Sequence, residues 1–284
     1  MRINYTILSA PENFTDNNGF NTKTEMNVLK VTHNAGFFSN LTVKLIEIVI
    51  YFNDKRFLPD VVDGSEQFIH YKSRAGDNMV EYYFENNPMP IEYEKQIPLW
   101  YDCMAIQFDS YKNLPFEQIK PFVEKYFTPS ENVQNCTRFF EERYNLDYNN
   151  LCSVFYRGND KNREMEVSPY SIFINKAKEI KAKNPDIKFL VQPDETEFLE
   201  AFLAEFPDSI YFEETPHMRK KDSAMFFELP IEHRGEYGAK FFAAVLCLSK
   251  CKHVITHSGN GALWLSLYRG NADNVNQVFN NNWI

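Results

Sequence analysis

Short apolar runs alternate with amphipathic segments through the second half of the chain, and this pattern restricts the fold more than any other feature. The apolar runs are "LCSVFY" (151–156), "IKFLV" (187–191), "SIYFEE" (209–214) and "KHVIT" (252–256). Segments with the length and periodicity of helices cover 168–184, 197–206, 236–250 and 262–269. Strands that alternate with helices predict a parallel sheet in a Rossmann-like α/β domain.

Several of the expected helices carry residues that are typical of helix ends. Ser168 is expected as an N-cap with Pro169 at the first helical position, and Gly270 follows the last helix. Pro207 is expected to end the helix at 197–206. These positions support the helical segments independently of their hydrophobic pattern.

The first half is less regular. Strands are expected at 27–33, 60–63, 79–85 and 99–108, and helices at 41–55, 115–127 and 129–144. The loop at 34–40 lies between the first strand and a long amphipathic helix, with Ser39 or Asn40 as the expected N-cap. We predict a Rossmann-like domain over 1–128 and a second one over 129–284.

Composition excludes several classes of protein. The 284 residues carry a net charge of −9 and no basic block, which disfavours extensive binding to nucleic acid. No window approaches the ~20 apolar residues of a membrane span, and the N-terminus lacks a signal-like apolar region, so we expect a cytoplasmic protein. The five cysteines are irregularly spaced without CxxC, which indicates reduced thiols.

Polar turns follow three of the expected strands, at 157–161, 192–196 and 256–261. In an open parallel sheet, ligands bind outside the carboxyl ends of the strands. We therefore expect these turns to lie together at one edge. The loop at 34–40 is expected to face them across a cleft between the two domains.

The turn "THSGNGALW" suits an anion. Small residues allow close approach of the backbone, and free N–H groups at the start of a helix point toward a bound phosphate. The candidates are Thr256, Ser258, Gly259 and Asn260. Arg157 would add charge-assisted hydrogen bonds to the same diphosphate. An ordinary strand-to-helix turn remains the alternative.

Four further positions have two interpretations each. Gly36 and Asn40 either line the cleft near the donor or form an ordinary capped turn. Gln192 and Asp194 either contact a nucleotide or sugar hydroxyl, or the turn serves to cap the following helix through Asp194 or Thr196.

Common catalytic motifs are absent from the sequence. There is no GxxxxGK[ST], GxSxG or HExxH, and no DxD pair of the kind with which many sugar transferases hold a metal ion. The ExE pairs at Glu92/Glu94 and Glu164/Glu166 are weak signals. We therefore predict no metal and no cofactor, and an arginine that offsets the charge of a leaving diphosphate.

"VFYRGNDK" (154–161) resembles the H-x-R-x-x-D-K type motif of the fucosyltransferase superfamily, which includes α1,6-, nodulation and protein O-fucosyltransferases. Arg157, Asp160 and Lys161 fall on its Arg, Asp and Lys, whereas Phe155 replaces the His and Gly158 a frequent second Arg. "HVITHSGNGALWLSLYR" (253–269) and "QPDE" (192–195) are similar to later regions of the family.

The resemblance implies a GT-B fold, two Rossmann-like domains facing a cleft, and metal-independent, inverting transfer of fucose from GDP-fucose to a glycan or glycoconjugate hydroxyl. It implies that Arg157 binds the diphosphate, supported by Asp160 and Lys161. The residues do not choose the general base among Asp160, Glu213, Glu214, His217 and His257, with His33 as a weaker candidate. The alternatives are another nucleotide sugar, a non-catalytic nucleotide- or glycan-binding protein, and an α/β domain with a different function.

Overall fold

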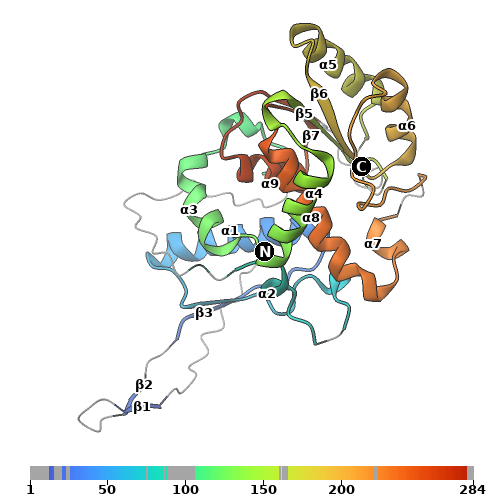
Figure 1. Cartoon of the computed structure of the whole chain (residues 1–284). Helices are drawn as coiled ribbons and strands as arrows, with labels where there is room; N and C mark the ends of the chain where they lie inside the picture. Colours follow the sequence, from blue (N-terminus) through green and yellow to red (C-terminus); the bar gives the residue numbers. More distant parts are fainter. Residues whose placement is uncertain are drawn as a thin grey trace.

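A four-stranded parallel sheet in the order β6-β5-β7-β8 organises the second half of the chain (Figure 1). In this computed structural model, the residues described are 13–15, 21–23, 26–74, 76–85, 87, 106–159, 161, 166–220 and 223–279. The sheet strands are β5 (Leu151–Tyr156), β6 (Lys188–Pro193), β7 (His253–His257) and β8 (Val275–Val278). The predicted parallel α/β fold of this half is therefore confirmed.

Helices connect and cover these strands. They are α1 (Phe37–Lys55), α2 (Met79–Tyr83), α3 (Phe116–Tyr126), α4 (Glu131–Tyr144), α5 (Tyr170–Lys183), α6 (Thr196–Glu205), α7 (Met225–Glu228), α8 (Arg234–Lys250) and α9 (Asn260–Arg269). None of the helices in the described part of the chain is long and apolar enough to span a membrane.

Both faces of the sheet are buried because successive side chains of a strand point to opposite sides. In β5, Cys152, Val154 and Tyr156 pack with α5 and α6 in one hydrophobic cluster. Leu151 and Phe155 belong to the other cluster, which includes α8 and α9. Figure 1 shows α5 and α6 on one side of the sheet and α8 and α9 on the other. This explains why all six residues of β5 are buried.

The first half contributes a parallel pair, β3 (Val28–Lys30) and β4 (Val61–Asp63), connected through α1. A separate antiparallel pair consists of β1 (Asn13–Thr15) and β2 (Asn21–Lys23). The α1 helix packs against α9, where Trp264 Nε1 donates a 3.0 Å hydrogen bond to Thr42 Oγ1. One hydrophobic cluster thus includes residues from both halves, and the division at residue 128 stays a prediction.

Several expected elements differ in the structure. Residues 79–85 were expected as a strand, but 79–83 form α2, because the Asn78 side chain accepts a hydrogen bond from the Val80 N–H and starts a helix. Residues 99–105 lie outside the described residues, and 106–108 form a turn. At 209–214 there is a single bridge between Ile210 and Leu190. The short polar strand β8 was not expected.

The helix ends agree with the sequence to different degrees. The Ser130 side chain caps α4, and Gly270 ends α9 in the left-handed conformation, as predicted. Pro169 takes the N-cap position of α5, one residue after the expected Ser168. Gly36 is the N-cap of α1, so the helix begins at Phe37 and includes both residues expected as its cap.

Candidate functional site

Arg157 and Asp194 meet at the carboxyl edge of the four-stranded sheet, where β5 and β6 end side by side. Arg157 Nε donates to Asp194 Oδ2 at 2.8 Å, and the Gly158 N–H donates to Asp194 Oδ1 at 2.8 Å. One carboxylate therefore holds both the arginine and the turn that follows it. The interpretation of Asp194 as a helix cap does not describe these contacts.

The Arg157 guanidinium also lies 5.7 Å from the centre of the Phe241 ring in α8, within the range of a cation–π interaction. Its side chain is 22% exposed. Because an ion pair and a ring fix the guanidinium from two elements, Arg157 presents a positive charge in a defined place.

This charge lies in the wall of a cavity of about 350 Å³. The first half of the chain contributes His33, Gly36, Ser39 and Tyr71, while Arg157, Lys161 and Asn260 come from the carboxyl edge of the sheet. Much of the remaining lining is aromatic: Phe37, Phe38, Phe226, Tyr237 and Phe241. The cavity thus brings together five predicted site residues: Gly36, Arg157, Lys161, Asn260 and the weaker candidate His33.

The aromatic wall was not predicted as part of the site. Tyr237 and Phe241 are four residues apart on α8, so they lie on the same helix face with their rings stacked at 5.9 Å. That spacing is visible in the sequence, but it is equally typical of an ordinary core face. Only their position beside Arg157 distinguishes these rings.

Two of the predicted binding residues shape the site without lining this cavity. Asn40 is fully buried, and its Oδ1 accepts from the Ala35 N–H at 3.0 Å, which pins the turn before α1. Gln192 is buried as well, and its Oε1 accepts from Thr215 Oγ1 at 2.8 Å. Gln192 does line a smaller adjoining cavity together with Arg157. Asp160 lies outside the described residues.

The turn before α9 is buried beneath the segment around Gln107. The Gly259 N–H donates to the Gln107 carbonyl oxygen at 2.9 Å, and the Asn260 N–H donates to Gln107 Oε1 at 3.1 Å. The Ser258 N–H donates to the Val278 carbonyl oxygen. Protein acceptors therefore occupy the N–H groups of Ser258, Gly259 and Asn260, and the side chains of Thr256 and Ser258 are fully buried.

Phe155, which departs from the family motif, packs beneath this turn. A Cβ on Gly261 would come within 2.8 Å of its ring, so the glycine allows the turn to lie on Phe155. The ring also stacks against His257 at 6.1 Å. His257 is only 3% exposed and hydrogen-bonds through Nδ1 with the Ser258 carbonyl oxygen, so it does not line the cavity of Arg157.

Gly158, the second departure from the motif, has no room for a side chain. A Cβ there would lie 2.6 Å from Cε1 of Tyr156 and would also overlap Glu195. Glu195 is 1% exposed, and burial raises the pKa of its carboxyl above the ordinary value. The turn after β5 is thus closely packed, and an arginine does not fit at position 158.

The remaining candidates for a general base are dispersed. Glu213 and Glu214 both pair with Arg143 of α4, at 2.9 and 3.0 Å. His217 Nδ1 and Thr196 Oγ1 are 2.8 Å apart. Glu213, Glu214 and His217 do not line the cavity, whereas His33 does.

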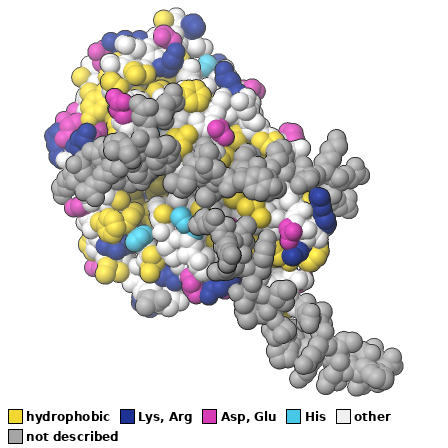
Figure 2. Space-filling view, turned by 180° about the vertical axis from the view of Figure 1, so that it is seen from behind, with side chains coloured by type: hydrophobic (Ala, Val, Ile, Leu, Met, Phe, Trp, Pro, Cys, Tyr) yellow, Lys and Arg dark blue, Asp and Glu magenta, His cyan; other side chains and the backbone are white. Residues whose placement is uncertain are grey.

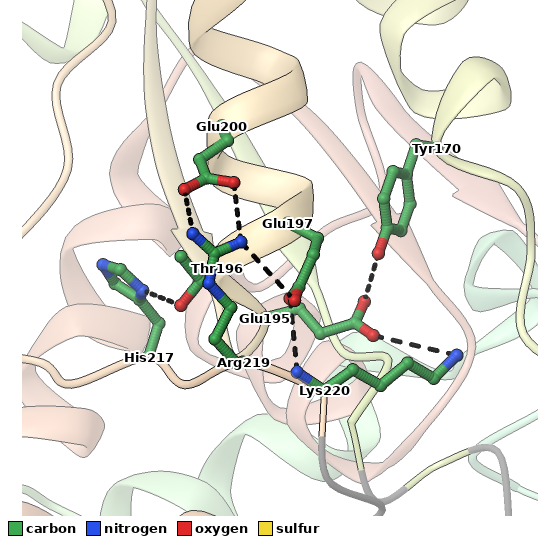
Figure 3. A network of polar contacts seen from close by, with 8 residues as sticks. All are labelled: Tyr170, Glu195, Thr196, Glu197, Glu200, His217, Arg219 and Lys220. Atoms are coloured by element: carbon green, nitrogen blue, oxygen red, sulfur yellow. Dashed lines mark hydrogen bonds and ion pairs between the residues drawn. The ribbon is translucent and has the colours of Figure 1, made fainter.

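Figure 3 shows how the segment that carries His217 is attached to α6. Arg219 forms a two-pronged ion pair with Glu200, and the Lys220 N–H donates to Glu197 Oε2 at 3.2 Å. The Met218 N–H donates to the Asp194 carbonyl oxygen, so this segment supports the residue that holds Arg157.

A larger cavity, of about 580 Å³, is also lined by two lysines, Lys44 and Lys125, but four carboxylate side chains line it as well. On the face drawn in Figure 2, Lys and Arg side chains alternate with Asp and Glu rather than forming a basic patch. Among the described residues, no cluster of three or more His, Cys, Asp or Glu side chains is arranged to hold a metal ion.

Comparisons with known proteins give structural matches only. No family model and no curated protein matches the sequence. Fucosyltransferase NodZ from Bradyrhizobium matches at 13% identity over 80% of this chain and 87% of that one, with a TM-score of 0.49. NodZ α-1,6-fucosyltransferase soaked with GDP-fucose matches at 12% identity over 85% and 91%, also at 0.49.

Proposed function

We propose that the chain is a glycosyltransferase that moves a sugar from a nucleoside diphosphate sugar to a hydroxyl of a glycan or glycoconjugate. The observation that carries this proposal is the cavity lined by Arg157 and Lys161 at one wall and by the turn at Gly36 at another. Two cations match the charge of a diphosphate. The rings of Phe226, Tyr237 and Phe241 offer flat apolar surfaces to a sugar or a nucleobase.

In this proposal the donor is GDP-fucose, as the motif around Arg157 implies, and the transfer is inverting and independent of a metal. Arg157 stabilises the leaving diphosphate, Lys161 adds a second positive charge, and Asn260 offers an amide to the donor. Asp194 is a positioning residue for Arg157. Thr256, Ser258 and Gly259 were predicted to contact the donor. In this proposal they instead support the turn that carries Asn260, because the N–H groups of Ser258 and Gly259 already donate to protein acceptors.

Binding and turnover are tested separately. Thermal shift and calorimetry with GDP and UDP measure binding, and hydrolysis of GDP-fucose, other GDP-sugars and UDP-sugars measures turnover with water as the acceptor. We expect GDP to bind and GDP-fucose to be hydrolysed fastest. Stabilisation by UDP but not GDP contradicts the fucose donor. Binding of GDP with no turnover of any donor identifies a non-catalytic nucleotide-binding protein.

Arg157→Ala is expected to lower kcat by about 10²–10³-fold, the effect of removing one group that stabilises developing negative charge. Arg143→Ala is the matched control. Arg143 also pairs with a carboxylate, Glu214, at 3.0 Å and lies over an aromatic ring, Tyr144, at 5.7 Å, but it is outside the cavity. Equal losses in the two variants would reject the assigned role of Arg157.

A further inference from the structure

His33 lies between β3 and α1, in the wall of the cavity that also contains Arg157 and Lys161. It comes from the first half of the chain, whereas both cations come from the second. An inverting displacement needs the base and the leaving group on opposite faces of the sugar ring. Carrying the two functions on different segments suits that requirement.

The His33 ring is held by a serine. Its Nε2 lies 3.0 Å from Ser39 Oγ in the first turn of α1. With the Nε2 proton donated to Ser39, the lone pair of Nδ1 is available, and no described residue hydrogen-bonds to Nδ1. The Ser39 contact therefore fixes the orientation of the ring, and the tautomer with its proton on Nε2 is the one that suits proton abstraction by Nδ1.

The surroundings of His33 favour the neutral ring. Burial lowers the pKa of His33 below its ordinary value of 6.5. The other ionisable side chains among the described lining residues are Tyr71, Tyr237, Arg157 and Lys161, and none of them is a carboxylate that would hold a proton on the ring. Among those lining residues, His33 is the one side chain suited to accept a proton near neutral pH.

We infer that His33, oriented by Ser39, is the general base that takes the proton of the acceptor hydroxyl, an inference that rests on the glycosyl transfer proposed above. The acceptor oxygen bonds to the anomeric carbon as the bond from that carbon to the diphosphate oxygen breaks. The hydroxyl proton moves to Nδ1 of His33. The nucleoside diphosphate leaves with the electron pair of the broken bond, its charge facing Arg157 and Lys161, and His33 then releases the proton to solvent.

The pH dependence of GDP-fucose hydrolysis tests this role, with water as the acceptor. The wild-type protein should lose activity on the acid side, with a pKa below 6.5, because protonated His33 is no longer a base. His33→Gln should lower kcat by about 10²-fold or more and remove this acid limb. Its affinity for GDP should be unchanged. Added imidazole should restore part of the activity of His33→Ala.

The matched control is His253→Gln. His253 is also partly buried with a lowered pKa, but it lies at the start of β7, outside the cavity. Its replacement should leave kcat and the acid limb unchanged. Ser39→Ala should lower kcat several-fold and shift the acid limb, and Ser39→Thr should restore both.

Two failures are distinguishable. A folded His33→Gln variant that keeps kcat within about fivefold of wild type and retains the acid limb overturns the role of His33 and leaves the proposed function intact. A wild-type protein that binds neither GDP nor UDP and hydrolyses no donor overturns the proposed function, and with it this inference.

Discussion

Arg157 and Lys44 are both cations that are largely shielded from solvent, but they differ in the partners that surround their charges. Arg157 has a carboxylate partner at 2.8 Å and an aromatic ring at 5.7 Å. Lys44 of α1 is 4% exposed and lies 5.6 Å from the centre of the Phe127 ring, with no ion pair or hydrogen bond to a described residue. Burial lowers the pKa of Lys44 to about 8, partly offset by Asp63.

The charge of Arg157 is held in place by a partner, whereas the charge of Lys44 is buried at a cost in stability. At the sheet edge, Asp194 compensates the desolvation of Arg157 and fixes its direction, which is what a binding site for an anion requires. Lys44 lines another cavity, of about 580 Å³, without such a partner. Its protonated form is therefore expected to destabilise the fold.

The largest expected effect comes from breaking the pair at the sheet edge. Asp194→Asn removes the carboxylate charge that pairs with Arg157 at 2.8 Å and should lower the free energy of unfolding by roughly 3–4 kcal/mol. Turnover should fall as well, because the guanidinium is no longer fixed. Urea unfolding and the hydrolysis assay measure the two losses.

Glu213→Gln is the control for this variant, since Glu213 pairs with Arg143 at 2.9 Å on the exposed surface. It should cost less than about 1 kcal/mol. Similar costs in the two variants would mean that burial does not distinguish the two arginine pairs.

Lys44→Met should instead raise the free energy of unfolding. The lowering of the Lys44 pKa from 10.5 to about 8 corresponds to about 3 kcal/mol of destabilisation at pH 7, which an apolar side chain of similar length removes. Denaturant unfolding should therefore show a more stable variant. Lys125→Met, in the lining of the same cavity, should change stability little. A destabilised Lys44→Met variant would show that the ammonium has a compensating partner.

The pH dependence gives an independent check of the same cost. Because the folded-state pKa of Lys44 is lowered, the cost is fully present below about pH 8. Between about pH 8 and pH 10.5, Lys44 is deprotonated in the folded chain but still protonated in the unfolded chain. The free energy of unfolding therefore rises with pH over this interval. The wild-type protein should gain stability relative to Lys44→Met across this interval, and a constant difference would contradict the assignment.

The smallest expected effect concerns the turn that carries Arg157. Gly158→Ala should lower stability by about 2 kcal/mol, since the added methyl group overlaps Tyr156 and Glu195. Gly36→Ala, on the opposite side of the cavity, meets no atom within 4 Å and should cost less than about 1 kcal/mol. Thermal unfolding of the two variants measures the contrast, and equal values would reject the packing at Gly158.

The sequence predicts the placement of Arg157 but not its partner. An arginine directly after a buried strand has to lie at the carboxyl edge of a parallel sheet, and the structure puts it there. Asp194 was expected to contact a ligand or cap a helix, yet it binds Arg157 from 37 residues away. Residues 79–85 were assigned to a strand because their apolar spacing is too short to exclude one, and the Asn78 cap starts a helix.

The sequence by itself determines the parallel α/β fold of the second half, because helix and strand periodicities and turn residues act over a few neighbouring positions. It also determines which polar turns follow the strands. The tertiary structure alone decides which of those groups face a cavity, because pairing and burial depend on residues distant in the chain. The Asn260 N–H finds its acceptor on Gln107, 153 residues away, and His33 meets the cavity of Arg157 only after both halves pack together.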